Sequence, residues 1–477
     1  MLMVMTMSTK IQTHTFEEKF QWVKQTFEQN DAGFQIVIAR KGQVAYDCHN
    51  LMITQRIKSV KNIDECAGII RDWLKFFRRG HHAVLVKPPQ STADNKDTKI
   101  SLSMQPKYWQ GDITQFQQYL SNKTEIDYEG VWGIDGNYKI GIIKEGNAYI
   151  GFIIESKFET WLPNMIKLKI ENIEEQVKST LYMRDFSPVM CGAPSLIKSF
   201  GLKIGTTNLK RLYPKPQLDR QDESYLRYLA SNDPYLEDLN KNTLYFRIPT
   251  FYNETETMLE KLVSENLDKI TQTENLIIDI RSNPGDSTSV TKPLIPILHT
   301  NSISISETLI YASPLNIQAY ADILQRTDDF DDNFIKYAKD VYESIKNKQG
   351  EFVNVISDVT EIEPANKVLK YPKNIGIILN NESGSTAEWF AMIAKQSKKV
   401  KLFGVPTNGI IDTANPNNIT SPCGELELVY CMAIDSSARY IPLDDIGVQP
   451  DFLIDSSIPD NKWVDHVNDI MQNWTVK

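Results

Sequence analysis

The most informative stretch of the sequence is Asn374-Ile-Gly-Ile-Ile-Leu379, which is followed by Asn380-Asn-Glu-Ser-Gly-Ser-Thr-Ala-Glu388. The first part is a nearly continuous apolar run, as a strand buried on both faces of a parallel sheet requires. The second part is small and polar, and such residues turn the chain before a helix. The stretch therefore predicts a strand, a turn and a helix over 385–399, with 401–404 as the next strand of a β-α-β unit.

A second apolar run has the same character. Asn275-Leu-Ile-Ile-Asp-Ile280 reads as another buried strand, and it ends in the turn Arg281-Ser-Asn-Pro-Gly285. Buried strands that alternate with helical segments are typical of an α/β fold. We therefore predict an α/β domain from about residue 217 to residue 477.

Two other segments precede this α/β part. Residues 1–90 predict helices, because apolar residues recur at helical spacing. One of these helices is expected over 63–77, with Gly80 as its C-cap. The polar stretch at 88–97 is expected to be a linker. From about 100 to 213 the apolar period changes to two, which predicts a small β-rich domain.

The β-rich segment contains a clear hairpin pattern. Residues 138–143 and 149–154 read as two strands, and Glu145-Gly-Asn147 reads as the turn between them. Residues 166–170 alternate as a further strand. Pro214-Lys-Pro216 marks the expected end of the segment.

Composition excludes several classes of function. The 477 residues carry 52 basic and 61 acidic side chains, a net charge of -9, which disfavours binding to nucleic acid. The five cysteines are scattered without a CxxC spacing, and the six histidines form no HxH or HExxH pattern, so we expect no metal site and no disulfide framework. No segment is apolar enough to span a membrane, and Met1–Met7 lacks the features of a signal peptide. A soluble protein of undetermined compartment and oligomeric state is expected.

Ser385 is the candidate nucleophile. A serine between a buried strand and a helix is presented at the carboxyl edge of the sheet, where backbone N–H groups of the helix start point outward. Gly285, at the end of the other strand, could donate to an oxyanion from one side, and Thr386 from the other. The alternatives are an ordinary helix cap at Ser385 and an ordinary strand-ending turn at Gly285.

Four motifs in order make the sequence recognisable. Asp279-Ile-Arg-Ser-Asn-Pro-Gly285 resembles the "D-x-R-x-N-x-G" strand end of the C-terminal-processing and tricorn-core serine peptidase family. Gly384-Ser-Thr-Ala-Glu388 resembles its "S-A-x-E" nucleophile turn, Gly404–Gly409 its "G-x-x-T-x-G" stretch and Gly447–Asp451 its "G-V-x-P-D" ending. The resemblance covers roughly 240–455.

The resemblance implies a crotonase-like α/β core and serine peptidase activity on a peptide or unfolded protein substrate, without metal or cofactor. It also implies Ser385 as nucleophile, with Gly285 and Thr386 as oxyanion hole. One branch of the family uses a lysine base about 25 residues after the serine. Here that region reads Asn408-Gly-Ile-Ile-Asp-Thr413 and contains no lysine.

The tricorn-like branch instead uses a histidine from the N-terminal part. Gly80-His81 resembles its "D-G-H" motif, so His81 is the expected base and Asp444 the expected orienting carboxylate, with His82 and Asp445 as rivals. The PDZ domain usual in the family is not evident.

Two departures from the family pattern leave another function open. Asp286 replaces a second glycine after Gly285, and Arg79 stands where the tricorn-like branch has aspartate. A catalytically degenerate member that binds a peptide or small ligand is therefore the alternative. An acyl-CoA enzyme of the same general fold would need a basic cluster, which the sequence does not show.

Overall fold

The computed structural model describes residues 15–87 and 106–473, except for 135, 174–175, 185, 206, 331, 356–360 and 363–367. The linker predicted at 88–97 lies outside the described residues. The chain divides into two compact units. One comprises the residues up to 91 together with 233–459 and 463–477, and the other comprises 92–232 with 460–462.

The first unit begins with helices, as predicted for the first ninety residues. These are α1 (Phe16–Asn30), α2 (Phe34–Lys41), α3 (Gln43–Ile57) and α4 (Ile63–Leu74). The expected cap at Gly80 is wrong, because α4 already ends at Leu74. Phe77 then turns into the aromatic core beside Trp73. The left-handed residue of this turn is His81, with φ 57°.

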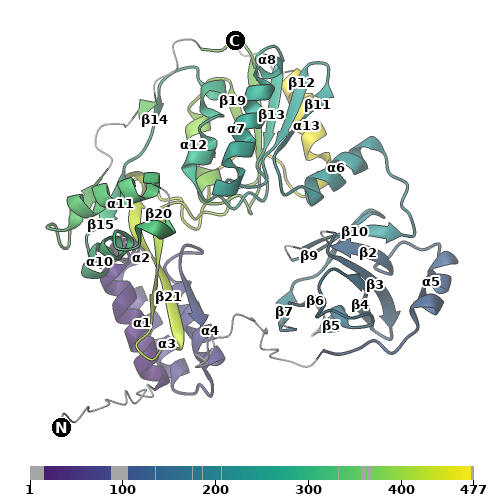
Figure 1. The fold of residues 1–477 in the computed structure, drawn as a ribbon, viewed down its shortest axis with the longest axis horizontal. Helices are drawn as coiled ribbons and strands as arrows, with labels where there is room; N and C mark the ends of the chain where they lie inside the picture. The colour runs from purple at the N-terminus through teal and green to yellow at the C-terminus, as the bar shows by residue number, and fades with distance from the viewer. Residues whose placement is uncertain are drawn as a thin grey trace, which may run out of the picture. The chain divides into compact units, whose positions relative to one another are not determined.

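Strand β1 (Ala83–Val86) joins these helices to a five-stranded sheet from the C-terminal half (Figure 1). The sheet is built around β21 (Leu426–Asp435), which has β20 (Thr413–Thr420) along one side. On its other side β1 pairs with one end of β21 and β15 (Thr308–Tyr311) with the other. Strand β1 starts directly after His82. Its pairing with β21 therefore holds the turn that contains His81 and His82, the histidine turn, against strands from the C-terminal half of the unit.

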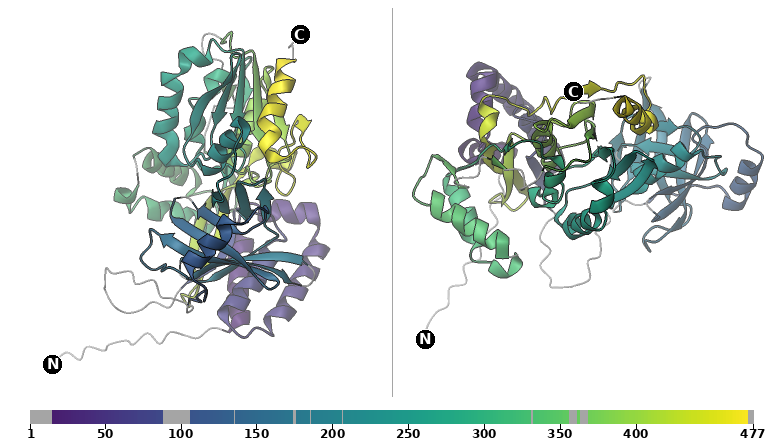
Figure 2. Two further views of the ribbon diagram at one scale, coloured as in Figure 1. Left: turned by 90° about the vertical axis from the view of Figure 1, so that its right-hand side faces the viewer. Right: turned by 90° about the horizontal axis from the view of Figure 1, so that it is seen from above.

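A second, six-stranded sheet carries the predicted β-α-β unit. Its order is β11-β12-β13-β18-β19-β22, and all neighbours from β12 onward are parallel. Helices α7 and α12 cover one face and α13 covers the other (Figure 2). The helix predicted over 385–399 is five residues shorter than expected, since α12 begins at Thr386 and ends at Lys395. The elements are β11 (Tyr235–Asn240), β12 (Thr243–Arg247), α7 (Glu256–Glu265), β13 (Asn275–Asp279), β18 (Asn374–Leu379), α12 (Thr386–Lys395), β19 (Val400–Gly404), β22 (Phe452–Leu453) and α13 (Trp463–Gln472).

Further elements complete the first unit, and α10 and α11 pack beside the five-stranded sheet. They are α8 (Leu267–Ile270), α9 (Ile295–Leu298), β14 (Ile303–Ser304), α10 (Pro314–Ile323), α11 (Asp332–Ile345), β16 (Phe352–Asn354) and β17 (Glu361–Ile362).

The second unit contains a nine-stranded antiparallel sheet, in the order β7-β6-β5-β4-β3-β2-β10-β9-β8. The predicted hairpin is β3–β4, with Gly146 at φ 58° in its turn. The outermost strands of the pairing order, β7 and β8, are only three residues apart in the chain, so the sheet curls until its edges approach each other. Two helices were not predicted, α5 and α6. The elements are α5 (Ile113–Ser121), β2 (Gly130–Ile134), β3 (Tyr138–Glu145), β4 (Ala148–Ser156), β5 (Ile166–Ile173), β6 (Gln176–Tyr182), β7 (Pro188–Cys191), β8 (Ser195–Ile197), β9 (Gly201–Ile204), β10 (Thr207–Tyr213) and α6 (Arg220–Ala230).

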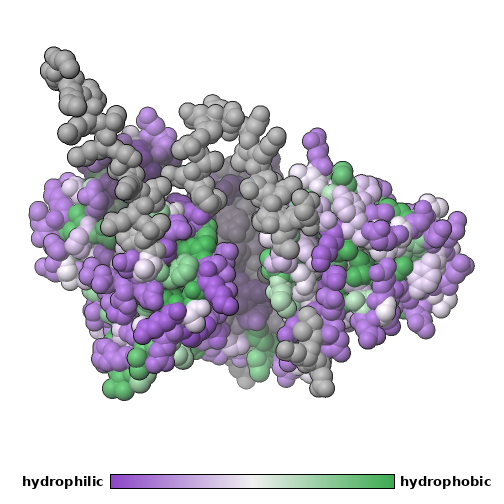
Figure 3. Space-filling view, turned by 90° about the horizontal axis from the view of Figure 1, so that it is seen from below, coloured by the Kyte–Doolittle hydropathy of each residue, from purple (hydrophilic) through white to green (hydrophobic). Residues whose placement is uncertain are grey.

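Figure 3 shows one face, on which hydrophilic residues predominate and apolar residues form separate areas. None of the helices in the described ranges combines the length and the apolar character needed to cross a bilayer.

Candidate active site

Ser385 lies where the sequence predicted it, between the carboxyl end of β18 and the start of α12. Its backbone has φ 53° and ψ -118°, a conformation that costs a non-glycine residue free energy and persists only when its surroundings hold it. Its side chain is partly exposed, and its N–H donates to Glu388 Oε2 at 2.9 Å. A strained strand-to-helix turn of this kind presents a serine hydroxyl at the edge of a sheet.

Gly285 lies directly against this turn. A Cβ atom added to Gly285 would come within 2.5 Å of the Thr386 nitrogen and 2.8 Å of Ser385 Cβ. The Thr386 N–H is the first of α12 and has no intrahelical acceptor. The Gly285 N–H donates to Asn283 Oδ1 at 2.9 Å, so it would have to exchange or share that bond to receive an oxyanion.

Buried polar groups fix the loop that carries Gly285. Asp279 is fully buried and forms an ion pair of 2.6 Å with Arg281. Burial alone would raise the pKa of Asp279, but Arg281 and Arg247 outweigh it and hold the pKa below its ordinary value. The Asn283 amide donates to the Ile248 carbonyl at 3.1 Å. The "D-x-R-x-N-x-G" residues therefore act as the scaffold of the site.

Substitution of Gly285 by alanine tests the space beside the nucleophile. We expect Gly285→Ala to lower kcat/KM for a peptide substrate by about 10²- to 10³-fold, because the new methyl group would fill the space in front of the Thr386 N–H. Gly350→Ala is the matched control. Gly350 has φ 86°, close to the 88° of Gly285, but its added Cβ would meet no described atom within 4 Å. Equal losses of activity in both variants would attribute the effect to backbone strain alone.

Glu388 connects the nucleophile turn to the next loop, and sequence reasoning missed it. Its side chain is fully buried and accepts hydrogen bonds from Ser385 N, Gly409 N at 2.7 Å and Ile410 N at 2.9 Å, besides the Thr407 hydroxyl. Burial raises the pKa of this carboxyl, although these hydrogen bonds act in the opposite direction. The glutamate of the "S-A-x-E" pattern was the available signal.

Ile410 brings the histidine turn and the serine turn together. Its side chain would lie 2.7 Å from a Cβ added to Gly80 and 2.9 Å from a Cβ added to Gly384. The residues that directly precede His81 and Ser385 therefore both contact this isoleucine. The N-terminal segment thus lies beside the α/β site, as the assignment of His81 requires.

The two histidines have different surroundings. His81 Nδ1 lies 2.6 Å from the Thr413 carbonyl, which only accepts, so Nδ1 carries the proton and Nε2 keeps its lone pair. Burial lowers the pKa of His81. His82 Nε2 lies 2.7 Å from the Arg78 carbonyl, and burial lowers the pKa of His82 to about 4. Across the described residues, neither imidazole is hydrogen-bonded to Ser385.

Asp444 is buried rather than solvated. Its Oδ1 accepts from Asp412 N at 2.9 Å, and Asp412 Oδ2 accepts from Asp444 N at 3.0 Å. Burial and the neighbouring Asp412 raise the pKa of Asp444 to about 7. No hydrogen bond joins Asp444 to His81 in the described structure. The bond that orients His81 comes from Thr413, which sequence reasoning could not identify because a backbone carbonyl leaves no signature.

The two departures from the family pattern, Asp286 and Arg79, are both exposed. The exposed Asp286 carboxylate accepts a hydrogen bond from Asn253 N at 3.3 Å. The backbone carbonyl of Asp286 accepts from the Thr386 hydroxyl at 2.7 Å. Arg79 is exposed and lies 3.9 Å from Asp445, the rival of Asp444. Asp445 also lies 3.5 Å from Lys41.

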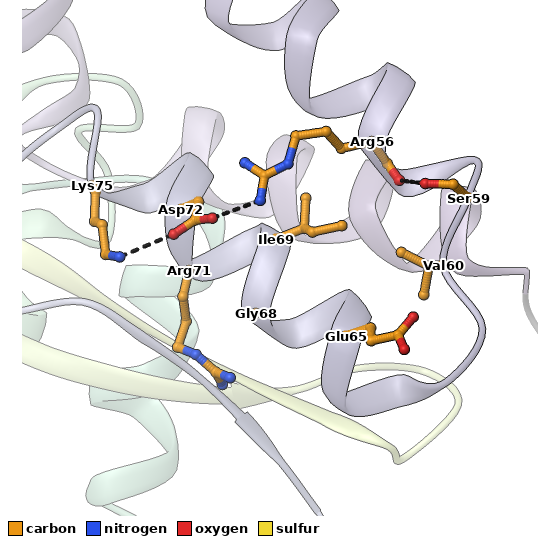
Figure 4. Close-up of a pocket in the computed structure, with 9 residues that line it drawn as sticks. All are labelled: Arg56, Ser59, Val60, Glu65, Gly68, Ile69, Arg71, Asp72 and Lys75. Atoms are coloured by element: carbon orange, nitrogen blue, oxygen red, sulfur yellow. Dashed lines mark hydrogen bonds and ion pairs between the residues drawn. The ribbon is translucent and has the colours of Figure 1, made fainter. Parts of the chain in front are cut away.

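A surface hollow of about 530 Å³ on the N-terminal helices is separate from these residues (Figure 4). Three of its charged side chains pair with one another, since Asp72 bonds both Arg56 and Lys75. None of the predicted site residues lines it.

Comparison with known proteins identifies the α/β part. Residues 242–454 match the model of peptidase family S41. The chain carries a peptidase family S41 domain. This confirms the family resemblance seen in the motifs and makes the chain a serine-type peptidase, a hydrolase of peptides or proteins. The matched S41 segment contains Gly285, Ser385, Thr386 and Asp444, and it leaves out His81.

Solved structures resemble the chain well beyond the matched segment. The structure of mature CPAF complexed with lactacystin is 11% identical with a TM-score of 0.51, covering 96% of this chain and 98% of that one. A CPAF mutant gives the same identity and TM-score over 97% and 98% of the two chains. At this identity the likeness concerns the fold alone. No curated protein sequence matches the chain.

Proposed function

We propose that this S41 peptidase hydrolyses peptide bonds through an acyl-serine intermediate on Ser385, with His81 as general base. Gly285 and Thr386 supply the oxyanion hole. The observation that supports this most is the close approach of Gly285 to the strained Ser385 turn, where a Cβ added to Gly285 would lie 2.5 Å from the Thr386 nitrogen, beside the partly exposed Ser385. We further propose a crotonase-like core, with the segment 100–213 influencing the choice of substrate.

The proposed reaction needs one proton carrier. Ser385 Oγ attacks the peptide carbonyl carbon and its proton passes to His81 Nε2. The resulting oxyanion accepts from the two N–H groups, and the imidazolium then protonates the leaving amine as the C–N bond breaks. Water attacks the acyl-serine carbonyl carbon and gives a proton to His81 Nε2. The imidazolium then protonates Ser385 Oγ as the acyl C–Oγ bond breaks, which releases the carboxylic acid product and regenerates free Ser385 and neutral His81.

Thr413 and Asp444 divide the orienting role in this proposal. The Thr413 carbonyl accepts from His81 Nδ1 and fixes the tautomer that can act as base. Asp444 accepts from the N–H of Asp412, the residue before Thr413. Asp444 is thus proposed as a positioning residue that reaches His81 through the 412–413 backbone.

A histidine base fits the structure better than a lysine base. Burial lowers the pKa of Lys399 to about 8, a value that would suit a base. Lys399, however, directly precedes Val400 at the amino end of β19, whereas Ser385 follows the carboxyl end of the parallel strand β18. A strand of this length separates the two edges by roughly 15 Å.

Reaction with a fluorophosphonate probe tests the proposed function. We expect the full-length chain to be labelled on Ser385, identified by fragmentation of the modified peptide so that Ser383 is distinguished. The labelling should persist in EDTA, because the proposed mechanism needs no metal ion. A folded protein that fails to react would favour the alternative, a degenerate member that binds a peptide or small ligand without hydrolysing it.

A further inference from the structure

We propose that the buried pair Asp31–Arg78 positions the catalytic base by holding the backbone of Gly80 and His81. This inference rests on the proposed role of His81. Neither Asp31 nor Arg78 belongs to the segment that matches peptidase family S41.

The pair is completely enclosed. The Arg78 side chain is 1% exposed and that of Asp31 is not exposed at all. Arg78 Nη1 and Nη2 donate to Asp31 Oδ1 at 2.9 Å and Oδ2 at 2.6 Å, the bidentate geometry in which an arginine–carboxylate pair is strongest.

The remaining donors of Arg78 hold the histidine turn. Arg78 Nε donates to the Gly80 carbonyl at 3.1 Å, and Nη2 reaches the His81 carbonyl at 3.3 Å. His81 has φ 57°, a left-handed conformation that few non-glycine residues adopt without support. The guanidinium supplies that support at the two carbonyls on either side of the strained Cα.

Asp31 anchors this arrangement to the five-stranded sheet. Besides Arg78, it accepts from Gly33 N and from Cys431 N of β21, both at 3.0 Å. The Cys431 thiol also lies 3.3 Å from the His81 carbonyl. Strand β21 pairs directly with β20, which begins at Thr413, the residue that receives His81 Nδ1. The strands β20 and β21 therefore hold His81 at two places. Its ring bonds to β20 through the Thr413 carbonyl, and its backbone is connected to β21 through Arg78 and Asp31.

A role in stability alone explains the pair poorly. Transfer of two charges from water to the protein interior costs free energy, and the attraction between the charges often does no more than offset that cost. Well-packed apolar residues would therefore stabilise the fold at least as well. Directional hydrogen bonds to two specified carbonyls are what apolar residues could not provide.

The charges of the pair act on His81 in opposite directions, and this makes the proposal testable. Arg78 lowers the pKa of His81 and Asp31 raises it, while burial has the largest effect and lowers it. The other groups around them are the Thr413 carbonyl, the Cys431 thiol, whose pKa is raised by burial to about 12, and Asp444, which acts on Arg78.

The experiment compares Asp31→Asn, Arg78→Gln and Arg78→Lys in the full-length chain. We expect Asp31→Asn to move the acid limb of the kcat/KM profile to lower pH and Arg78→Gln to move it to higher pH, each by about 1 unit. Arg78→Lys keeps the charge but cannot hold both carbonyls, so the limb should stay while the plateau falls about 10- to 100-fold. Asp72→Asn, which removes an exposed ion pair between α4 and Arg56 of α3, should change neither quantity.

A second readout separates this inference from the proposed function. The pKa of His81, followed by NMR in the same variants and assigned with His81→Gln, does not depend on turnover. If Asp31→Asn and Arg78→Gln shift this pKa in opposite directions but the protein hydrolyses no peptide, the inference that the pair positions His81 stands and only the proposed hydrolysis fails. Shifts in the same direction, or folded variants with unchanged profiles, would overturn the inference.

Discussion

Replacing Ser385 with alanine is expected to lower kcat/KM for peptide hydrolysis by about 10⁶-fold, because the bond-forming atom is removed and the members of such a site act as a unit. The fold should persist. Ser385 is partly exposed, and its backbone N–H, which donates to Glu388, is unaffected by the change. Kinetics on a fluorogenic peptide, with thermal unfolding as the measure of folding, check both expectations.

Ser383 provides the control two residues away. Its hydroxyl is buried and donates to the Ile280 carbonyl at 2.9 Å. Ser383→Ala should therefore reduce the free energy of unfolding by about 1 kcal/mol and keep most of the activity. Turnover of Ser385→Ala at the wild-type rate would remove Ser385 from the mechanism, whatever the control showed.

The elements around Ser385 could be predicted because their signals are local. Continuous apolar runs predict β13 and β18. Because these two strands pair in parallel, Gly285 and Ser385 lie at the same edge of the sheet. The boundaries were less certain. The residues around Gly80 predict a helix cap there, but the helix ends at Leu74 and Phe77 packs into the aromatic core.

The supporting contacts could not be predicted, because they join residues far apart in the chain. Asp31 meets Cys431 across 400 positions, and His81 meets Thr413 across 332. Nothing in either local sequence names its partner, and in the second case the acceptor is a backbone carbonyl. The position of the proposed nucleophile between β18 and α12 could thus be predicted from the sequence, whereas the contacts around His81 depend on the tertiary fold.

Exchange of each histidine for alanine is expected to separate the two candidates for the base. His81→Ala should lower kcat/KM by several orders of magnitude, comparable to Ser385→Ala, since Nε2 of His81 is the nitrogen that keeps its lone pair. His82→Ala should cost mainly stability, about 1 kcal/mol for the hydrogen bond to the Arg78 carbonyl. Added imidazole should restore part of the activity of His81→Ala and none of that lost in His82→Ala.

The pH dependence of activity tests the assignment of His81 as the base independently of the alanine variants. Burial lowers the pKa of His81 below its ordinary value of 6.5, so the neutral base should predominate at pH 7. Activity should fall only as the pH drops through that lowered value, where the imidazole becomes protonated and can no longer accept from Ser385. If His82 were the base, the limb would lie near its pKa of about 4. If His82→Ala is inactive and His81→Ala is active, a histidine base remains but His82 holds the role. If both variants stay active, the base is neither histidine and the proposed mechanism fails.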